Sequence, residues 1–590
     1  MRKVYSLVFW LGVFLFFWLL VPYHLRFHEQ FQFFRFGTDY FMESVLHPEG
    51  FSFYLGGFVT QFFLYPWAGA LVVVLLLVLL QRLVARISYR VPGRADGNTF
   101  LYPLTFIPSA FVWLLLCNEN YMISAVVALL LSLWAVNLYQ RAGAGNLRIA
   151  VFYILQPVLF FASGGTVIIF TACFLYLEAF RRENTGHWKW YAVRVLLAVV
   201  LVFLYPVAVR LFFQYPYAKL LGGIHFYRYY YFSYPIQYIA WILAAAVPLS
   251  CRLIPTPGPG RLRRIVSPVL CALIGAGTVF GLYRFTDLDK ELLFGYDILV
   301  YEEEWEEVLQ RAQKDPPGSS IEMVAVNLAL WKTGRLETEM FHYPQQGPEG
   351  LMMSFRRDFV TPLMMSDVYL HLGMVNSAQR NAYDAMEAIP DFQKSARCYK
   401  RLAQTHIING HYRVARSFLE QLSKTLFYRK WAQDAMQYLG NEERIEDDPV
   451  YGKVRRMRYR DEMLFSPQGL NAMLDVLYRE NRENKMAYAY MLAYTMLAKD
   501  LERFANYITL EYPAGSDKPL PVPYQEALAL YWVQSHTSLE DIPWEITDYV
   551  YRKLNDFTAA YRQFAGGRPE RVLKKDFGKT YWYYVFFTKT

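Results

Sequence analysis

The residues best suited to chemistry lie in a polar segment, residues 23–54, that follows the first long apolar run. Four carboxylates and a histidine stand out in it: Glu29, Asp39, Glu43, His47 and Glu49. If residues 38–47 form a helix, Asp39, Glu43 and His47 occupy positions i, i+4 and i+8 and share one face. Such side chains could hold a divalent cation or accept a proton from an attacking hydroxyl. The spacing therefore makes Asp39, Glu43 and His47 a candidate metal site.

The same face also has an interpretation without a reaction. Charged side chains along one side of a short helix are typical of an interfacial helix that lies on a membrane with its polar face in water. Phe41 and Val45 would then face lipid or protein. The spacing alone leaves both interpretations open.

A second polar region, residues 214–236, is densely aromatic and contains His225 and Arg228. Its rings could stack on sugar faces, with a lipid diphosphate near Arg228, or they could belong to the aromatic belt of any membrane span. The rings are Tyr215, Tyr217, Phe226, Tyr227, Tyr229, Tyr230, Tyr231, Phe232 and Tyr234. We predict Arg228, His225 and Tyr230 as substrate-binding candidates. Glu119, in the short turn 117–120, is either a solvated turn residue or a third acidic group that reaches the same outer cavity as the carboxylates of residues 23–54.

Nine apolar segments are expected to position these loops. A helix needs about 20 apolar residues to cross about 30 Å of hydrocarbon. Segments that qualify are about 4–22, 55–81, 101–117, 121–139, 148–163, 164–180, 191–213, 237–251 and 265–284. The second is long enough to tilt or to begin as an interfacial piece. Gly164 and Gly165 permit a tight reversal between two segments, and Pro157 and Pro206 are expected to kink theirs.

The basic residues of the loops predict the orientation of this bundle. With a cytoplasmic N-terminus, four basic residues lie outside (Arg26, Arg35, Lys219 and Arg228) and sixteen lie inside. The inside set is Arg2, Lys3, Arg82, Arg86, Arg90, Arg94, Arg141, Arg148, Arg181, Arg182, Lys189, Arg194, Arg252, Arg261, Arg263 and Arg264. This asymmetry is the one that the positive-inside rule describes. An odd number of spans then places the second half in the periplasm of a bacterium with two membranes.

Composition excludes some classes of protein. The chain has 590 residues, of which 55% are hydrophobic and 19% charged, against about 25% charged in a soluble protein. The net charge of +9 comes largely from short loops, and no nucleic-acid motif accompanies it, so no nucleic-acid partner is expected. Of five cysteines only Cys398 lies in the second half, which excludes a disulfide framework there.

Residues 287–590 have the composition of a soluble, all-helical domain. The boundary is expected near Asp287, where the apolar runs give way to Asp-Leu-Asp-Lys-Glu at residues 287–291. The proline- and glycine-rich segment 255–260 is instead interpreted as a loop on the cytoplasmic side. Apolar residues recur at helical spacing in short paired segments. Three of these are followed by Gly334, Gly373 and Gly410, at spacings of 39 and 37 residues. This pattern resembles tetratricopeptide repeats (TPR), whose unit is about 34 residues.

Stacked helix pairs form extended grooves that typically bind peptides or partner proteins. The TPR-like domain would therefore bind envelope proteins, or it would only rigidify or shield the membrane part. The C-terminal run 581–587, Tyr-Trp-Tyr-Tyr-Val-Phe-Phe, is apolar enough that we expect it to be buried or docked.

Two resemblances extend these predictions. The segment 47–63, His-Pro-Glu-Gly-Phe-Ser-Phe-Tyr-Leu-Gly-Gly-Phe-Val-Thr-Gln-Phe-Phe, resembles an uncharacterised family of multi-span proteins of Bacteroidota, over nearly the full length of the chain. The bundle, its acidic first outer loop and its outside domain also look like the GT-C superfamily of membrane glycosyltransferases. That resemblance implies a lipid-linked sugar donor and an acidic base or metal ligand in the first outer loop, with Asp39 first, then Glu43 and Glu29. Many members carry a paired acidic motif, whereas three residues separate Asp39 from Glu43 here.

Three functions are therefore considered. The first is group transfer from a polyprenyl-linked sugar at the outer face of the inner membrane; the cofactor is unknown, and a divalent cation is compatible with this reaction. The second is a non-catalytic membrane scaffold whose TPR-like domain binds envelope proteins. A transporter is disfavoured, because few ionisable residues lie at mid-depth of the apolar segments and no inverted repeat is evident.

Overall fold

The computed structural model describes residues 2–91, 99–142, 146–180, 188–229, 231–254, 261–390, 393–459, 469–535, 541–564 and 567–588. Within these ranges the regular structure is helical, and the one β-type pairing is an isolated bridge between Tyr121 and Tyr227. The predicted all-α class is confirmed for this part of the chain. The predicted loop 255–260 and the basic residues Arg94, Arg181 and Arg182 lie outside it.

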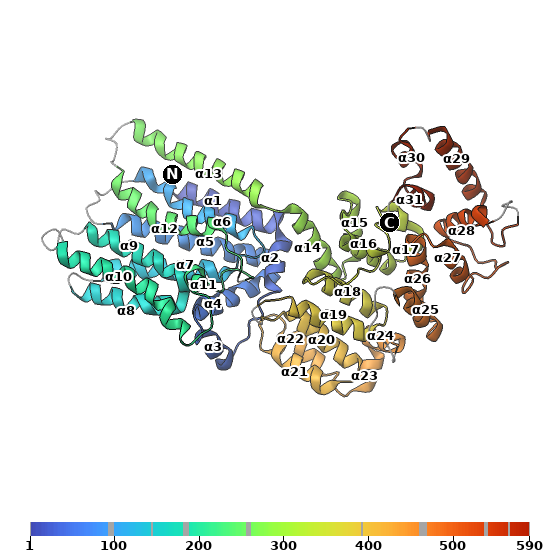
Figure 1. Cartoon of the computed structure of the whole chain (residues 1–590), viewed down its shortest axis with the longest axis horizontal. Coiled ribbons are helices and arrows are strands. Elements are labelled where there is room, and N and C mark those ends of the chain that lie inside the picture. Colours follow the sequence, from blue (N-terminus) through green and yellow to red (C-terminus); the bar gives the residue numbers. More distant parts are fainter. Residues whose placement is uncertain are drawn as a thin grey trace. The chain divides into compact units, whose positions relative to one another are not determined.

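The chain forms two compact units (Figure 1). The N-terminal unit comprises Met1–Glu291 together with two short segments of the second half, Ile389–Ala396 and Gln421–Lys430. The C-terminal unit comprises Leu292–Ala388, Arg397–Glu420 and Trp431–Thr590. The division falls within helix α14, Leu288–Tyr301.

Among the described residues, six helices of the N-terminal unit are long and apolar enough to cross a membrane. They are Arg2–Leu20, Pro66–Tyr89, Ile123–Arg141, Asn146–Ala179, Trp188–Arg210 and Ile265–Phe285. Shorter apolar helices cover Gly50–Leu64, Leu101–Leu116 and Pro235–Cys251. The length and composition of these helices are those of a membrane protein, while the count of nine spans stays a prediction.

One expected segment, 55–81, is wrong as a continuous helix. The structure divides it between α4 (Gly50–Thr60, extended by a 3-10 turn to Leu64) and α5 (Pro66–Tyr89). Tyr65 between them is extended, with φ −109° and ψ 110°. The residue before a proline is forced out of the helical region, and proline itself is well suited to a first helical turn. Pro66 therefore begins the long apolar helix.

The turn expected at Gly164 is confirmed. Helix α8 (Asn146–Ser163) ends there and α9 (Val167–Ala179) follows a short 3-10 turn, with Gly164 at φ +60°. A β-carbon at Gly164 would come within 2.1 Å of Glu49 Oε1, so a larger residue has no room. This glycine thus allows the turn and also the close approach of the polar segment that contains Glu49.

Polar side chains tie the apolar helices together. In α8, Gln156 Nε2 donates to Thr171 Oγ1 of α9 at 3.0 Å and to the carbonyl of Ala198 at 2.9 Å. Arg148, counted above among the loop cations, is instead 1% exposed and pairs with Glu178 at 3.0 Å. In hydrocarbon such pairs satisfy groups that water cannot reach.

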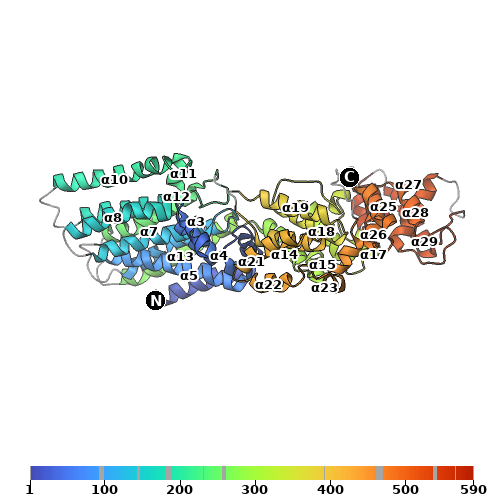
Figure 2. The ribbon, with the colours of Figure 1, turned by 90° about the horizontal axis from the view of Figure 1, so that it is seen from below.

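Two long apolar helices lie at the periphery of this unit. In the most apolar 18-residue stretch of α10 (Trp188–Arg210), and in that of α13 (Arg261–Phe285), only 17% of the residues are buried. Figure 2 shows α10 at the outer edge of the N-terminal unit, and Figure 1 shows α13 at another edge. Their exposed side chains are mainly apolar, as expected for helices that face lipid.

The C-terminal unit is built from short helices around three that are buried on nearly all sides. These are α16 (Ser320–Lys332), α18 (Val360–His371) and α26 (Lys485–Leu497). Their partners in sequence include α15 (Trp305–Lys314), α17 (Leu336–Glu339), α19 (Val375–Glu387), α25 (Leu470–Glu480) and α27 (Leu501–Ile508). Five more short helices lie between α19 and α25: α20 (Ala396–Ile408), α21 (Tyr412–Ser423), α22 (Arg429–Met436), α23 (Glu442–Asp447) and α24 (Tyr451–Met457). The last four helices of the chain are α28 (Val522–Ser535), α29 (Asp548–Phe564), α30 (Pro569–Phe577) and α31 (Tyr581–Phe587).

The same turn recurs between successive helices of this unit. Gly334, Gly373 and Gly410 have φ of +73°, +83° and +79°, and Lys499 takes this place with φ +58°. Each turn is closed by an N–H···O bond across six residues: Arg335 to Leu330, Met374 to Tyr369, His411 to His406 and Asp500 to Thr495, at 2.7–2.9 Å. This is a Schellman-type helix end, which requires a left-handed residue. The TPR-like assignment itself stays a prediction.

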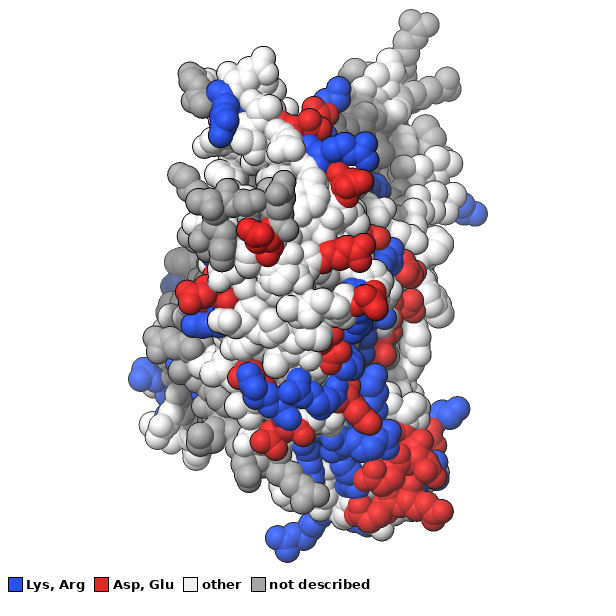
Figure 3. Space-filling model, turned by 90° about the vertical axis from the view of Figure 1, so that its right-hand side faces the viewer, with Lys and Arg blue, Asp and Glu red and all other residues white. Residues whose placement is uncertain are grey.

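Charged side chains of both signs cover the face shown in Figure 3 and gather at its lower end. One cluster of acidic side chains comes from helix α23 and the residue after it: Glu442, Glu443, Glu446, Asp447 and Asp448. Arg455 pairs with Glu442 and, at 3.4 Å, with Glu446. Mixed charges of this kind are typical of a water-exposed surface.

Candidate functional site

The polar segment after the first apolar helix contains three helices: α2 (Pro22–Glu29) ends with Glu29, and a tight turn joins the other two. Helix α3 covers Thr38–Val45 and α4 begins at Gly50. Glu49, just before α4, is left-handed with φ +65°. A β-carbon at Gly50 would lie 1.7 Å from the carbonyl oxygen of Ser44, so only glycine fits there. The turn thus brings the end of α3 against the start of α4.

Glu49 is the most buried carboxyl group of this segment, with a 0% exposed side chain. Its Oε2 accepts hydrogen bonds from the backbone N–H groups of Ile224 at 2.7 Å and His225 at 3.0 Å. Its Oε1 has no hydrogen-bond partner among the described residues. Burial raises the pKa of Glu49 to about 8, although the two N–H donors oppose the shift. Through these hydrogen bonds Glu49 connects the acidic loop, residues 23–54, to the aromatic loop, residues 214–236.

A cavity of about 290 Å³ opens beside this turn, and it contains three of the predicted site residues: Glu43, His47 and His225. The remaining lining residues are Phe33, Arg35, Tyr40, Ser44, Gly50, Phe53, Tyr215, Gln393 and Lys394, all within the N-terminal unit. An acid, two imidazoles and two cations therefore face one space with aromatic walls. We name it the outer-loop cavity.

The charged groups of the outer-loop cavity are held in place by short contacts. Arg35 Nη1 donates to Gln421 Oε1 at 2.6 Å, and its Nη2 lies 3.6 Å from Glu43 Oε2. His47 Nδ1 lies 2.8 Å from the carbonyl oxygen of Glu43. Burial, and next the nearby His47, lower the pKa of His225 to about 4. His225 is therefore a neutral hydrogen-bonding group at neutral pH, and its Nδ1 has no partner among the described atoms.

An apolar groove lies on the other side of the same turn. It measures about 610 Å³ and is lined by Val45 and Phe51 of the turn and by residues of α7 (Ile123–Arg141) and α8. These include Leu131, Trp134, Ala135, Leu155, Pro157, Val158, Leu159, Phe161 and Ala162. Residues 44–53 thus separate a polar cavity from a groove suited to hydrocarbon.

Four other predicted residues lie elsewhere or are not described. Asp39 is exposed on α3 and does not line the outer-loop cavity. Glu119 pairs with Lys290 at 2.7 Å. Arg228 is 6% exposed, and its guanidinium lies 3.3 Å from the centre of the Phe31 ring. Tyr230 lies outside the described residues. Of Asp39, Glu43, Glu119 and Arg228, only Glu43 therefore lines the outer-loop cavity.

Glu29 is buried against a segment from the second half of the sequence. Its two carboxyl oxygens accept from the Tyr428 hydroxyl at 3.3 and 3.2 Å, and Tyr428 belongs to the N-terminal unit. Burial raises the pKa of Glu29 to about 7, opposed by Arg26 and by the Tyr428 hydroxyl. The adjoining space measures about 10 Å³, close to the room that a single water needs. Glu29 is thus packed against Tyr428, and its catalytic role stays a prediction.

No three His, Cys, Asp or Glu side chains in the described parts of the chain are grouped as a metal ion would require. Asp39, Glu43 and His47 accordingly stay a prediction from spacing. Sequence reasoning placed Glu49 in the acidic loop without a role, and it missed Arg35 and Lys394 at the cavity. Only the Glu-Gly pair at 49–50, next to a proline, signalled a tight turn; nothing signalled that Lys394 would come from the second half.

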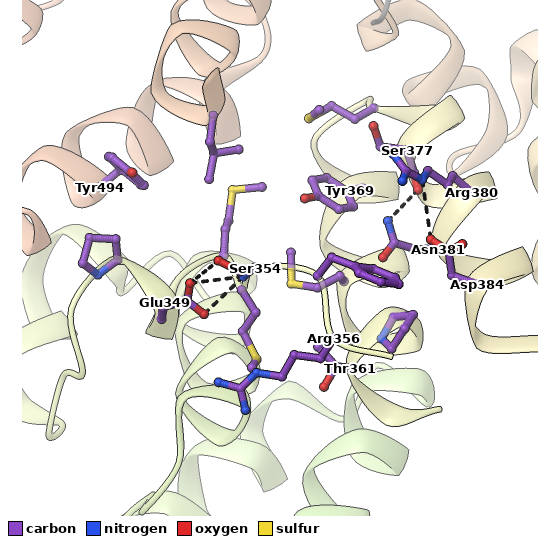
Figure 4. A pocket seen from close by; sticks show the side chains of 18 residues that line it. Glu349, Ser354, Arg356, Thr361, Tyr369, Ser377, Arg380, Asn381, Asp384 and Tyr494 are labelled. Carbon is purple, nitrogen blue, oxygen red and sulfur yellow. Dashed lines mark hydrogen bonds and ion pairs between the residues drawn. The ribbon is translucent and has the colours of Figure 1, made fainter. Parts of the chain in front are cut away.

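The C-terminal unit has a cavity of its own, of about 430 Å³, which is larger than the outer-loop cavity (Figure 4). Four methionines form much of its apolar wall: Met352, Met353, Met365 and Met374. On one side Glu349 accepts hydrogen bonds from Ser354, and on the other Arg380 and Asp384 approach to 3.6 Å. Arg356 also lines the cavity, and its side chain is exposed. Flexible thioethers adapt to different apolar partners.

The burial of Glu49 predicts a specific pH dependence of stability. Its pKa is higher in the folded than in the unfolded state, so its contribution is fully present below about pH 4.5 and is lost as pH rises to about 8. Glu49→Gln, which cannot ionise, should therefore melt at a higher temperature than the wild type at pH 8 and at a similar one at pH 5.

Glu49→Ala should be less stable at both pH values by about 1–3 kcal/mol, because two backbone N–H groups lose their acceptor. Thermal melts of the full chain in detergent measure this; a glutamine variant that follows the wild type at both pH values contradicts it.

The comparisons with known proteins bear on the family alone. No curated protein and no solved structure matches the chain. The resemblance to GT-C glycosyltransferases therefore stays a prediction. One family model, described as a family of unknown function (DUF6057), matches residues 1–588. The chain belongs to this family, DUF6057.

Proposed function

We propose that the chain transfers a sugar or a similar group from a polyprenyl-linked donor at the outer face of the inner membrane. The outer-loop cavity carries this proposal, because Glu43, His47 and His225 share it with two cations. The apolar groove on the other face of residues 44–53 supports it, since a lipid chain fits such a wall. Nine spans and a periplasmic C-terminal unit complete the proposed arrangement.

Contacts inside the N-terminal unit support the acidic loop and the segment Gln421–Lys430 of the second half lying on the same side of the membrane. The backbone N–H of Phe36 donates to the carbonyl of Lys424 at 2.7 Å, and Gln61 Oε1 accepts from the N–H of Leu426 at 3.3 Å. Phe427 packs between Phe62 and Tyr65, with ring centres 5.7 and 5.3 Å away. Segments in such contact lie on one side of a membrane. Without the buried Arg148, the remaining fifteen-to-four distribution of basic residues supports the outside as that side.

In the proposed reaction an acceptor hydroxyl attacks the sugar carbon that is bonded to the lipid phosphate. Glu43 accepts the hydroxyl proton as the new carbon–oxygen bond forms. The bond from that carbon to the phosphate oxygen breaks, and the lipid phosphate leaves with the electron pair. Arg35 and Lys394 face the negative charge that develops on it. His225, kept neutral by burial, is suited to orient a hydroxyl.

Two neighbouring carboxylates of α3 provide a matched test. Glu43→Gln should abolish the transferred product, while Asp39→Asn should leave it unchanged, because only Glu43 lines the cavity. Both side chains are exposed, so neither change should affect folding. The measurement is the envelope glycan and glycolipid profile of cells with equal amounts of each variant. Wild-type profiles for both variants would contradict the proposal.

A non-catalytic scaffold is the second candidate, and the dispersal of Asp39, Glu119 and Arg228 favours it. In this alternative the C-terminal unit is a TPR-like repeat that recruits envelope proteins. The methionine-lined cavity, which Arg356 also lines, would accept a partner's apolar side chain (Figure 4). Filling that cavity by Ser377→Trp should then change the phenotype of cells, whereas Glu43→Gln should not.

A further inference from the structure

The repeat of the C-terminal unit brings two basic side chains together at equivalent positions. Lys332 stands two residues before Gly334, and His371 stands two residues before Gly373. Because the helices that they end are neighbours in the stack, the two side chains meet: Lys332 Nζ lies 2.9 Å from His371 Nδ1. Both also approach the ring of Trp305, at 5.3 Å for the ammonium and 6.0 Å for the imidazole.

This pair lines a cavity of about 390 Å³. Its charged lining also includes Lys453 of α24 and Lys485 of α26, together with Glu303 and Glu483. The remaining wall is mainly apolar: Trp331, Pro449, Val450, Val454, Met457 and Met486. We name it the lysine cavity. It lies wholly within the C-terminal unit and is separate from the cavity of Figure 4.

The lining of the lysine cavity contains three lysines and two glutamates, and its ammonium groups differ in their partners. Neither Lys332 nor Lys453 forms an ion pair with a carboxylate among the described residues, whereas Lys485 is paired with Glu511 at 2.9 Å. Glu303 and Glu483 are exposed, so water can solvate their carboxylates. Lys332 is half-buried, and its ammonium group has three N–H donors, of which His371 accepts one.

The electrostatic environment points the same way. Burial lowers the pKa of Lys332 to about 8; Lys453 adds to the shift, while Glu303 and Asp367 oppose it. Burial, followed by Lys332, Arg401 and Lys453, lowers the pKa of His371 well below its usual value. A half-buried ammonium without an anionic partner is costly, and an added anion would offset that cost.

We propose that the lysine cavity binds an oxyanion, a phosphate or carboxylate group, between Lys332 and Lys453. The ammonium groups would donate charge-assisted hydrogen bonds to its oxygens. The surrounding tryptophan, valine and methionine side chains fit an apolar body attached to that group. This site is independent of the proposed reaction at the outer-loop cavity.

Amine footprinting tests the site with simple anions in place of the natural ligand. The purified full chain in detergent is acetylated with an N-hydroxysuccinimide ester, and the rate at each lysine is measured by mass spectrometry. At constant ionic strength, phosphate should slow the acetylation of Lys332 and Lys453 at least threefold relative to chloride. Lys574, exposed on α30 and remote from the cavity lining, is the control and should not change.

The probes are inorganic phosphate, phenyl phosphate and benzoate at equal concentration. Stronger protection by phenyl phosphate or benzoate identifies an anion with an apolar body, and protection by inorganic phosphate alone identifies a free phosphate. Lys332→Met should remove the protection of Lys453, and Lys453→Met, an exposed change that should not affect folding, should weaken that of Lys332. The proposal is overturned if no probe protects either lysine, or if Lys574 is protected equally.

Discussion

Trp582→Ala is expected to reduce the free energy of unfolding by about 3–5 kcal/mol, because it removes a large, fully buried ring from the C-terminal unit. Trp582 is 0% exposed, and its Nε1–H donates to the carbonyl of Glu526 at 2.9 Å. The same helix, α31, is fastened through Tyr581 to Met496 and through Tyr584 to Leu497. Loss of the ring should therefore release the C-terminal helix from α26 and α28.

Phe586→Ala on the same helix is the matched control. Its side chain is 47% exposed, so its replacement should cost only about 1 kcal/mol. Thermal unfolding of the full chain, followed by circular dichroism, compares the two variants. Equal midpoints for Trp582→Ala and Phe586→Ala would show that α31 is not docked as described.

Asp367→Ala should be nearly as damaging, because it breaks a buried network of charges. Asp367 pairs with Arg401 and, at 3.1 Å, with Arg397, which also pairs with Asp297 at 2.6 Å. The three side chains Arg397, Asp297 and Asp367 are 3%, 1% and 6% exposed. Removing one partner of a buried pair leaves an uncompensated charge and costs about 3–5 kcal/mol.

A surface pair of the same unit supplies the comparison. Arg335 and Glu306 approach to 2.6 Å, but their side chains are 30% and 65% exposed. Glu306→Ala should therefore cost at most about 1 kcal/mol. Asp367→Asn, which keeps the shape and loses the charge, should fall between the two. A melt of Asp367→Ala that matches that of Glu306→Ala would refute the buried network.

Much of the helical architecture could be predicted from local patterns. Long apolar runs, the turn at Gly164 and the glycines at 334, 373 and 410 act through rules that involve only neighbouring residues. The burial of the apolar C-terminal run was also expected, and Tyr581, Trp582 and Tyr584 confirm it. The break at Pro66 was missed because hydropathy continues across it, although proline restricts the preceding residue.

The candidate site could be predicted only in part, because its contacts are distant in sequence. The spacing grouped Asp39, Glu43 and His47 on one helix face, whereas α3 ends at Val45 and only Glu43 and His47 line the cavity, together with His225. It could not show that Lys394 joins this cavity from the second half. Nor could it show that Arg228 stacks on Phe31, since a cation–π contact leaves no pattern in one sequence.

The proposed function depends most directly on which side of the membrane the acidic loop and the C-terminal unit lie. Three exposed positions, Asp39, Phe355 and Arg141, can each be changed to cysteine and treated with a membrane-impermeant maleimide. In cells whose outer membrane alone has been permeabilised, Asp39→Cys and Phe355→Cys should react, and Arg141→Cys should react only after lysis. Protection of Phe355→Cys in those cells, with reaction after lysis, would contradict the proposed orientation and the reaction that depends on it.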